Sequence, residues 1–424
     1  MSGWTLRWPA GLRSCAALAL LAAAGLLAGV AHARDTGTSK GKAKDQNTAP
    51  SEASASENRL LEVYRLMAQG DTRRALDLAE KLVRDVPNFQ LAQLVYGDLL
   101  AARTRTLRSL GDIPAASANA GAGAGAAALA ELKDESQRRV MAIKERPTEG
   151  TVPSQFLKLS SQTRTAIAVD AARSRLYLFT NTPNGLRLTA DYYVSVGKAG
   201  TIKSQEGDQR TPLGVYYITS NLDTKVLNEF YGAGAMPLNY PNILDIKRGK
   251  SGSGIWLHGT PPQQYSRAPR STDGCLVLSN PDILALIRHV SVGATPVVVS
   301  SQLVWKPANQ LQSQARPFES ALNAWREAKV AGDLNKVLAF YTPDFASYGK
   351  NLAQYTPQIK SEIKAIKGHN VELKDLSYLN WSDSADTMVT TFGEVVEGRR
   401  TGMHKRQYWI RSNNDWQIFF EGVI

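Results

Sequence analysis

The sequence predicts a multidomain protein with an α-helical N-terminal part, a mainly-β central domain and a C-terminal α+β domain. Two changes of pattern support this division. Apolar residues recur at helical spacing in the first part, alternate with a period of two from about Thr163, and return to helical spacing near Phe318 before a series of long strand-like segments. A length of 424 residues suits two or three domains. With 43% hydrophobic and 21% charged residues, each domain can bury a core, which excludes a disordered chain.

Residues 1–33 have the pattern of an export signal. Arg7 and Arg13 precede an Ala/Leu run from Cys15 to Val30, and Ala31-His32-Ala33 has the small-x-small form of a cleavage site. The run of about 16 residues is shorter than the roughly 20 of a membrane-spanning helix. We therefore expect a cleaved signal and, for a Gram-negative source, a periplasmic protein. The alternative is an uncleaved signal that anchors the chain in the membrane.

The next segments are predicted to be a tether, a helical region and a linker. Residues 34–56 are polar and lack apolar periodicity, as in a flexible tether. Residues 57–110 have helical spacing with breaks at Gly70-Asp71 and Pro87-Asn88. This region resembles a tetratricopeptide-like hairpin, and an ordinary helical hairpin explains it equally well. An Ala/Gly linker and a charged helix are expected within 111–150.

Two further domains follow. Short alternating segments with turn clusters between them predict a mainly-β domain at 151–302, with one helix at Pro281–Val290. The Gln/Ser-rich residues 303–316 are predicted to be a linker. In 317–424, helices followed by an antiparallel meander predict an α+β sheet wrapped over helices. The expected helices are 318–330, 335–341 and 354–366, and the expected strands are 371–379, 387–397, 402–412 and 416–422.

The charge and the cysteine content exclude several classes of protein. The formal net charge is +12, and the segment 151–305 contributes 15 basic and nine acidic side chains to it. No basic helix or basic–aromatic strip accompanies this excess, so we expect an anionic substrate and no nucleic-acid partner. No Cys/His cluster has zinc-site spacing, and we expect neither a metal nor a cofactor.

The second cysteine, Cys275, is the candidate nucleophile. Cleavage of the signal would remove Cys15, so the exported chain would hold one thiol and no disulfide partner for it. His258 lies 17 residues upstream and is a candidate base that takes the thiol proton, while the carbonyl of Gly259 can fix its tautomer. Gly274 permits a tight turn in which the Gly274 and Cys275 amides face a developing oxyanion. The alternative is an inert buried cysteine and a structural histidine.

Three blocks of sequence carry a resemblance to a known family. They are Val196-Gly197-Lys198, the run from Gly207 to Ile218 with its Thr-Pro-Leu-Gly, and His258-Gly259 followed by Thr272-Asp-Gly-Cys275. In order and spacing they are similar to the catalytic domain of the L,D-transpeptidases (YkuD-like family), over residues 164–300. The resemblance implies that Cys275 is the nucleophile, that His258 is the general base and that the Gly259 carbonyl orients it.

Two positions depart from the family pattern. Asp273 replaces the family's second histidine, and Val277 replaces its usual Arg or Asn. A carboxylate beside the nucleophile opposes thiolate formation unless it has another partner, which we expect to be Arg270 or a backbone amide. Arg267 and Arg270 are both candidates for contact with an acidic substrate, and Arg270 is preferred. The expected substrate-binding residues are thus Arg270, Asp273 and Thr272.

The C-terminal segment resembles a second known fold. The runs Ala324-Trp-Arg to Gly332-Asp333 and Tyr341-Thr-Pro-Asp-Phe345 are similar to the SnoaL-like cone fold. This fold hosts enzymes, binding pockets and dimerisation units. We expect a binding or assembly role here, with envelope proteins as possible partners of the helical and C-terminal domains.

Together, the resemblances imply an exported cysteine peptidyl transferase of the cell-shape L,D-transpeptidase/carboxypeptidase type, acting on peptidoglycan stem peptides. Cys275 would attack the L-centre carbonyl of an L–D peptide bond, and the amine of a neighbouring stem would resolve the thioester. With water as the acceptor, the same site would make an L,D-carboxypeptidase that trims tetrapeptides. A third hypothesis, from a different class, is a non-catalytic envelope scaffold.

Overall fold

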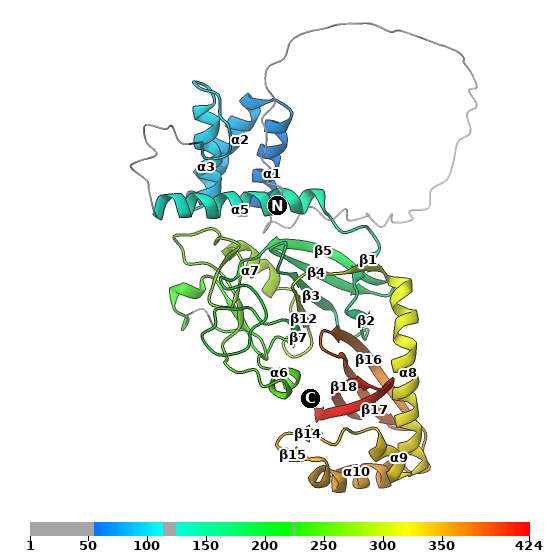
Figure 1. Cartoon of the computed structure of the whole chain (residues 1–424). Helices are drawn as coiled ribbons and strands as arrows, with labels where there is room; N and C mark the ends of the chain where they lie inside the picture. Colours follow the sequence, from blue (N-terminus) through cyan, green and yellow to red (C-terminus); the bar gives the residue numbers. More distant parts are fainter. Residues whose placement is uncertain (1–54, 113–123, 224) are drawn as a thin grey trace, which may run out of the picture.

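The computed structural model describes residues 55–112, 124–223 and 225–424. They form three parts stacked one above another, with helices first, the mainly-β domain in the middle and the α+β domain last (Figure 1). The fold class expected from the sequence is therefore confirmed. The predicted signal and nearly all of the predicted tether lie outside the described residues. No helix within the described ranges is long and apolar enough to cross a membrane.

The N-terminal part is a module of four described helices, which we call the helical module (residues 55–112 and 124–144). Its own apolar core includes Val63, Leu82 and Val95. Asp71 accepts a hydrogen bond from the Arg74 amide and so caps the second helix, at the break that the sequence indicated. The fourth helix lies across the ends of the others (Figure 1) and begins inside the expected Ala/Gly linker. The helices are α1 (Ala55–Ala68), α2 (Thr72–Asp85), α3 (Gln90–Ala101) and α5 (Ala124–Lys144).

A five-stranded sheet with the order β5-β4-β3-β12-β7 forms the centre of the middle domain. Alternate residues of its strands enter two different cores, since Ala166 and Ala168 face one while Ile167 and Val169 face the other. The second of these cores supports the small sheets that bear the candidate site. The strands of the central sheet are β3 (Thr165–Asp170), β4 (Arg175–Thr182), β5 (Gly185–Tyr193), β7 (Gly214–Tyr217) and β12 (Pro296–Ser300).

The smaller elements of this domain surround the predicted catalytic residues. One small sheet has the order β11-β9-β8, and a parallel pair joins β10 to β6. Ser279 caps α7, whose position matches the expected helix closely. The elements are β6 (Val196–Gly197), η3 (Glu229–Tyr231), β8 (Ala235–Pro237), α6 (Ile243–Lys247), β9 (Trp256–His258), β10 (Arg270–Thr272), β11 (Leu276–Val277) and α7 (Asn280–Ile287).

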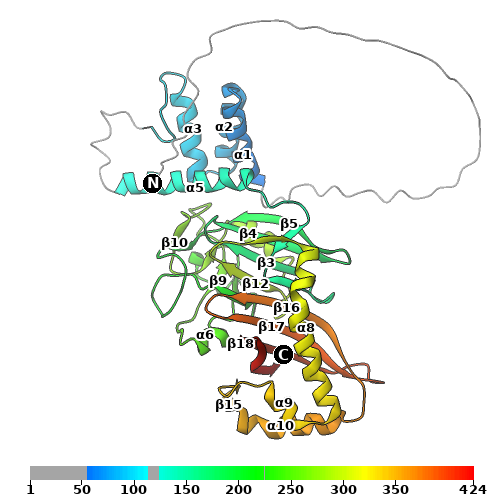
Figure 2. The same cartoon turned by 45° about the vertical axis from the view of Figure 1, so that its right-hand side comes forward.

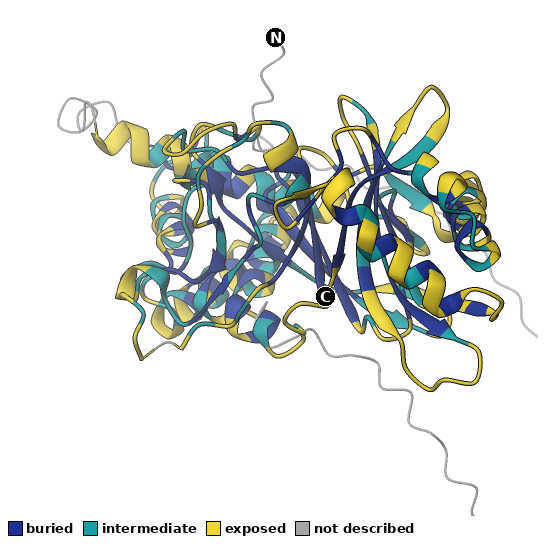
Figure 3. Ribbon diagram, turned by 90° about the horizontal axis from the view of Figure 1, so that it is seen from below, coloured by how far each residue is buried: buried dark blue, intermediate teal, exposed yellow. Residues whose placement is uncertain are grey.

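The C-terminal part wraps a long antiparallel sheet over three helices, as expected. Its strand order is β19-β18-β17-β16-β2, where β2 is Phe156–Lys158. Buried strands run through the interior of both β-containing parts (Figure 3). We call this part the cone domain. Its elements are α8 (Ala308–Ala331), α9 (Leu334–Ala339), β14 (Ala346–Ser347), β15 (Lys350–Asn351), α10 (Leu352–Ile366), β16 (Val371–Ser382), β17 (Asp386–Val396), β18 (Met403–Ser412) and β19 (Asp415–Val423).

Two expectations about the boundaries of the cone domain differ from the structure. The predicted linker 303–316 is not a linker, because it contains β13 (Trp305–Pro307) and the first turns of α8. Leu311 and Ala315 extend the buried face of α8, which runs along the sheet to α9 and α10 (Figure 2). In addition, β2 (Phe156–Lys158) lies within the predicted central range but pairs with β16 of the cone domain, while β1 (Thr151–Pro153) pairs with β13.

Candidate active site

A buried threonine joins the three sequence blocks that carried the family resemblance. The Gly197 amide donates to Thr211 Oγ1 at 2.9 Å, and the Thr211 hydroxyl donates to the Gly274 carbonyl at 2.9 Å. Two of these positions have no room for a side chain. A Cβ on Gly197 would lie 2.5 Å from the carbonyl oxygen of Gln209, and Gly274 has a φ of +129°. Each block therefore closes against the next around one turn.

Neighbouring parallel strands bring Cys275 and His258 together. In the β9–β11 register, Leu276 pairs with Leu257 and Val277 pairs with His258. Side chains two residues apart on a strand share a face, so Cys275, just before β11, lies on the same face as His258. The Cys275 thiol donates to the Gly254 carbonyl, with 3.4 Å between sulfur and oxygen.

His258 is held as a neutral base. It is 1% exposed, and its Nδ1 lies 2.7 Å from the Gly259 carbonyl oxygen. Burial lowers the pKa of His258 to about 4, and the nearby Arg267 lowers it further, although the hydrogen bond to Gly259 opposes the shift. At neutral pH the proton on Nδ1 is therefore donated to Gly259, and Nε2 has a free lone pair. A Cβ on Gly259 would meet Asn280 Oδ1 at 2.2 Å, so this carbonyl is fixed in a tightly packed turn.

The thiol of Cys275 is protonated at rest. Burial raises the pKa of Cys275, while a hydrogen bond from the Trp256 backbone and the charges of Arg267 and Lys203 lower it. Asp273 raises this pKa further. With a neutral thiol beside a neutral imidazole, the thiolate forms only as the proton moves to the base during attack on a carbonyl carbon.

Family models match the two C-terminal parts of the chain. Residues 164–299 match the L,D-transpeptidase catalytic domain (YkuD), which is the segment that holds Cys275 and His258. This segment is an L,D-transpeptidase catalytic domain. Residues 317–422 match the Cds6 C-terminal NTF2-like domain, so the cone domain is NTF2-like. Among curated proteins, no sequence is significantly similar to this chain.

Two solved structures are similar in fold to about two thirds of this chain. Bd1075 of Bdellovibrio bacteriovorus is 24% identical, with a TM-score of 0.55 over 64% of this chain and 98% of that chain. Pgp2 of Campylobacter jejuni, described as a helical cell shape determining protein, is 20% identical, with a TM-score of 0.50 over 64% of this chain and 95% of that chain. At these identities the likeness shows the fold.

Asp273 has a partner other than the two that we expected. Its carboxylate pairs with Lys198 Nζ at 3.0 Å, because the β10–β6 pairing sets Thr272 opposite Gly197 in the L,D-transpeptidase domain. Arg270 lies at the exposed end of β10, opposite Val196. The expected pairing of Asp273 with Arg270 is therefore wrong. Since both Lys198 and Asp273 are largely exposed, their pair contributes little to stability.

The structure also corrects two expected roles in the turn before Cys275. The Gly274 amide donates to Thr272 Oγ1 at 3.1 Å, so it is occupied and does not face a substrate carbonyl. Of the two predicted oxyanion donors, the Cys275 amide remains. Thr272 is buried, and its hydroxyl donates to the Cys275 carbonyl at 2.7 Å. Thr272 therefore shapes the turn and is not placed to touch a substrate.

Aromatic residues and a second arginine complete the site. The Phe230 ring lies 5.8 Å from the His258 ring, and the Tyr231 ring lies 5.2 Å from it. The Arg267 guanidinium lies 4.5 Å above the Phe230 ring. Arg267, and not the preferred Arg270, is thus the arginine beside the catalytic pair. The adjacent aromatics Phe230 and Tyr231 in an otherwise polar loop are the sequence signal for this part of the site.

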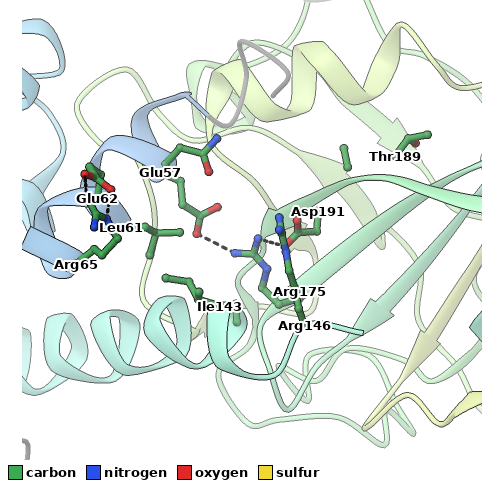
Figure 4. A pocket seen from close by; sticks show the side chains of 12 residues that line it. Glu57, Leu61, Glu62, Arg65, Ile143, Arg146, Arg175, Thr189 and Asp191 are labelled. Carbon is green, nitrogen blue, oxygen red and sulfur yellow. Dashed lines mark hydrogen bonds and ion pairs between the residues drawn. The ribbon is translucent and has the colours of Figure 1, made fainter. Parts of the chain in front are cut away.

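The cavity in Figure 4 is separate from this site. It has a volume of ≈ 370 Å³ and lies between α1, α5 and β5. Its charges pair among themselves, since Arg175 bonds both Glu57 and Asp191. Neither Cys275 nor His258 lines it. Within the described parts of the chain, no three His, Cys, Asp or Glu side chains are grouped so as to hold a metal ion.

Proposed function

We propose that this protein is an exported cysteine L,D-transpeptidase that acts on peptidoglycan stem peptides through a thioester on Cys275. The observation that supports the proposal most is the placement of Cys275 on the same face as a neutral His258 whose Nδ1 is engaged by the Gly259 carbonyl. This leaves Nε2 free to accept the thiol proton, as acyl transfer by cysteine requires.

The first half of the reaction forms the thioester. The proton on Cys275 Sγ moves to His258 Nε2 while the sulfur attacks the carbonyl carbon of the L-centre residue. The Cys275 amide faces the oxyanion of the tetrahedral intermediate. When the intermediate collapses, the C–N bond breaks, His258 Nε2 returns the proton to the departing nitrogen, and D-alanine leaves as a free amine.

The second half resolves the thioester. An amine from a neighbouring stem attacks the thioester carbon, His258 takes the proton of the attacking nitrogen, and the C–S bond breaks to regenerate the Cys275 thiol. The product is a cross-link between two stems. Stem peptides carry carboxylates, and Arg267 offers a cation beside the catalytic pair.

A second candidate uses the same thioester with water as the acceptor, which yields a tripeptide stem. The architecture favours keeping this candidate, because Pgp2, a cell shape determining protein, shares both the catalytic and the cone fold. The family resemblance described above also implies the L,D-carboxypeptidase type. Activity of either kind requires Cys275 and His258 in the same roles.

One incubation separates the two candidates. Purified protein is mixed with disaccharide-tetrapeptide, and the products are resolved by liquid chromatography with mass spectrometry. Cross-linked dimers support transfer, and tripeptide without dimers supports hydrolysis. Cys275→Ala should abolish both products, while the matched control Ser271→Ala, on neighbouring β10, should retain them.

Reaction with a carbapenem tests the nucleophile directly. The β-lactam should acylate wild-type Cys275, with a mass increase on the peptide that contains it, and Cys275→Ala should show none. If the wild type forms no adduct and Cys275→Ala retains full biological function, the scaffold hypothesis replaces the enzymatic one.

We also propose that the protein works in the periplasm, and that the helical module and the cone domain bind envelope partners. The export pattern at 1–33 and the substrate class support this location. Fractionation of cells that express the full chain, with and without residues 2–33, tests it. Absence of the full chain from the periplasmic fraction, or an unchanged distribution after the deletion, would contradict it.

A further inference from the structure

The loop between β9 and β10 connects His258 to the Cys275 turn, and its residues 260–266 are anchored on the helical module. Tyr265 is 4% exposed and belongs to the apolar core of that module. Its ring lies 4.2 Å from the ring of Phe89. Its amide donates to the Asn88 carbonyl at 3.0 Å, and Asn88 Nδ2 donates to the Pro262 carbonyl at 2.9 Å. The α2–α3 turn therefore holds the loop from one side.

Helix α5 holds the same loop from a second side. The Ser266 hydroxyl donates to Glu135 Oε1 at 2.8 Å. The same carboxylate accepts hydrogen bonds from Arg139, whose guanidinium lies 3.9 Å from the centroid of the Tyr193 ring. Arg139 also pairs with Glu57 of α1 at 2.7 Å, so this contact belongs to a buried network that fixes α5 on the catalytic domain.

The residue directly after these anchors is Arg267. The hydroxyl groups of Tyr193 and Ser195 donate to its carbonyl at 2.8 and 2.9 Å, which fixes its backbone. Its guanidinium, above Phe230, carries the charge that acts on both Cys275 and His258. The family pattern has an Arg or Asn two residues after the nucleophile, where this chain has Val277. Arg267 offers a cation from a different element.

We propose that the helical module is a positioning element of the active site, in which Asn88 and Glu135 hold the loop 260–266 and thereby hold Arg267 beside Cys275. Asn88 and Glu135 are positioning residues, because they act through Arg267. The role of Arg267 toward a stem-peptide carboxylate rests on the proposed function. Its effect on the thiol can be measured without peptidoglycan.

The test measures the rate at which iodoacetamide alkylates Cys275 in the full chain, followed by peptide mass spectrometry from pH 6 to pH 10. Besides His258, which is neutral over this range, the charged groups that act on the thiol are Arg267, Lys203 and Asp273, and Asp273 is itself paired with Lys198. The rate follows the thiolate fraction, so it reports the apparent pKa of Cys275.

Arg267→Ala should raise this apparent pKa and slow alkylation at pH 7 about tenfold, because a cation near a thiolate is removed. Asn88→Ala combined with Ser266→Ala should shift the profile in the same direction, by about threefold in rate. Adding those two changes to Arg267→Ala should have no further effect, since they act through Arg267. Arg267→Lys should restore most of the rate.

Ser136→Ala is the matched control, because its hydroxyl is bonded to Tyr64 within the helical module and not to the loop. It should leave the profile unchanged. The inference is overturned if the Asn88/Ser266 variant is alkylated as fast as the wild type, or if its effect is undiminished in the Arg267→Ala background.

Ser266→Ala alone removes one hydroxyl, so this single variant can be tested in the same way if the combined variant does not fold. If stem peptides are not turned over but the alkylation pattern holds, the proposed function fails and this inference stands.

Discussion

The helical module and the cone domain contact the catalytic domain in different ways. The cone domain shares one continuous apolar core with it, which runs from Ala166 and Val298 to Phe318 and Trp409. The helical module has a core of its own, to which the catalytic domain contributes Tyr265, and it docks through the buried Glu57–Arg175 ion pair and one active-site loop. A shared apolar core makes two parts unfold together, whereas a charged interface between separate cores can open alone. The cone domain is therefore part of the catalytic scaffold, and the helical module is the separable element.

The largest expected effect is in the cone domain. Lys405 is fully buried and contacts Glu362, Glu394 and Glu421 within 3.0 Å. Lys405→Met leaves these carboxylates facing one another with one cation fewer, at a cost of about 3–5 kcal/mol. Because the core is shared, thermal denaturation should show the catalytic and cone domains melting together at a lower temperature. Lys374→Met, on the exposed side of β16, is the control and should change the midpoint little. Separate melting of the cone domain alone would contradict the shared core.

Arg139→Met should destabilise the helical module and its docking on the catalytic domain by a similar or slightly smaller amount. It leaves Glu57 and Glu135 buried with fewer partners, at a cost of about 3 kcal/mol. This loss of stability should be confined to the helical module. Limited proteolysis should cut the helical module first, while the melting of the catalytic and cone domains stays close to that of the wild type. Arg84→Met, which removes an exposed ion pair on α2, is the control and should change neither measurement. A common drop in both transitions would show that the interface is not separable.

The two regions should also respond to pH in opposite directions. Burial raises the pKa of Asp282, beside the helical interface, to about 7, and the charge of Glu57 adds to the shift. Its neutral form favours the folded state, so this stability is present at about pH 4 and is lost as the pH rises through 7. In the cone domain, burial raises the pKa of Glu421, but Lys405 and Lys329 outweigh it and hold the pKa at about 2. That stability is present above about pH 4.5 and is lost as the pH falls toward 2.

Asp282→Asn checks this difference. At pH 8 it should raise the unfolding temperature, since it removes a buried charge that costs at most about 4 kcal/mol. At pH 4 it should match the wild type, whose carboxyl is then neutral. An equal gain at both pH values would mean that the charge of Asp282 is not the cause.

The smallest expected effect concerns the surface pairs between the cone and catalytic domains. Arg248 forms a two-bond pair with Asp383, and both side chains reach solvent. Asp383→Ala should cost less than about 1 kcal/mol, and less still in high salt. Thermal denaturation at low and high ionic strength measures it. A loss comparable to that of Lys405→Met would mean that this interface depends on ion pairs rather than on its apolar core.

Much of the fold follows from local pattern, and the exceptions have physical causes. The four long strands of the cone domain appear in the sequence because each runs for nine or more residues and contains several β-branched or aromatic side chains. The first turns of α8 were missed because Gln and Ser conceal the buried Leu311 and Ala315. Strand β2 is three residues long and acquires its identity from a partner far along the chain.

In the candidate site, too, some residues follow from local sequence motifs and others depend on contacts made in the folded chain. Cys275 and His258 lie in contiguous motifs, and their pairing across β9 and β11 needs only that these strands be adjacent. The partner of Asp273 and the arginine beside the thiol depend on which loop folds over the site. A loop between two motifs has no periodicity of its own, so the position of Arg267 depends on contacts with residues far along the chain, including Tyr193 and Ser195.

The short strand β2 has a consequence for how the protein can be divided. Ser160, just after it, is bonded to Ser377, 217 residues later in the chain. A fragment that begins at residue 164 keeps the whole matched catalytic segment but removes β2, so the outer edge of β16 becomes a row of unpaired amides and carbonyls. Such an edge pairs readily with another chain. The segment that looks like a connection between domains thus protects the cone sheet from edge-to-edge association.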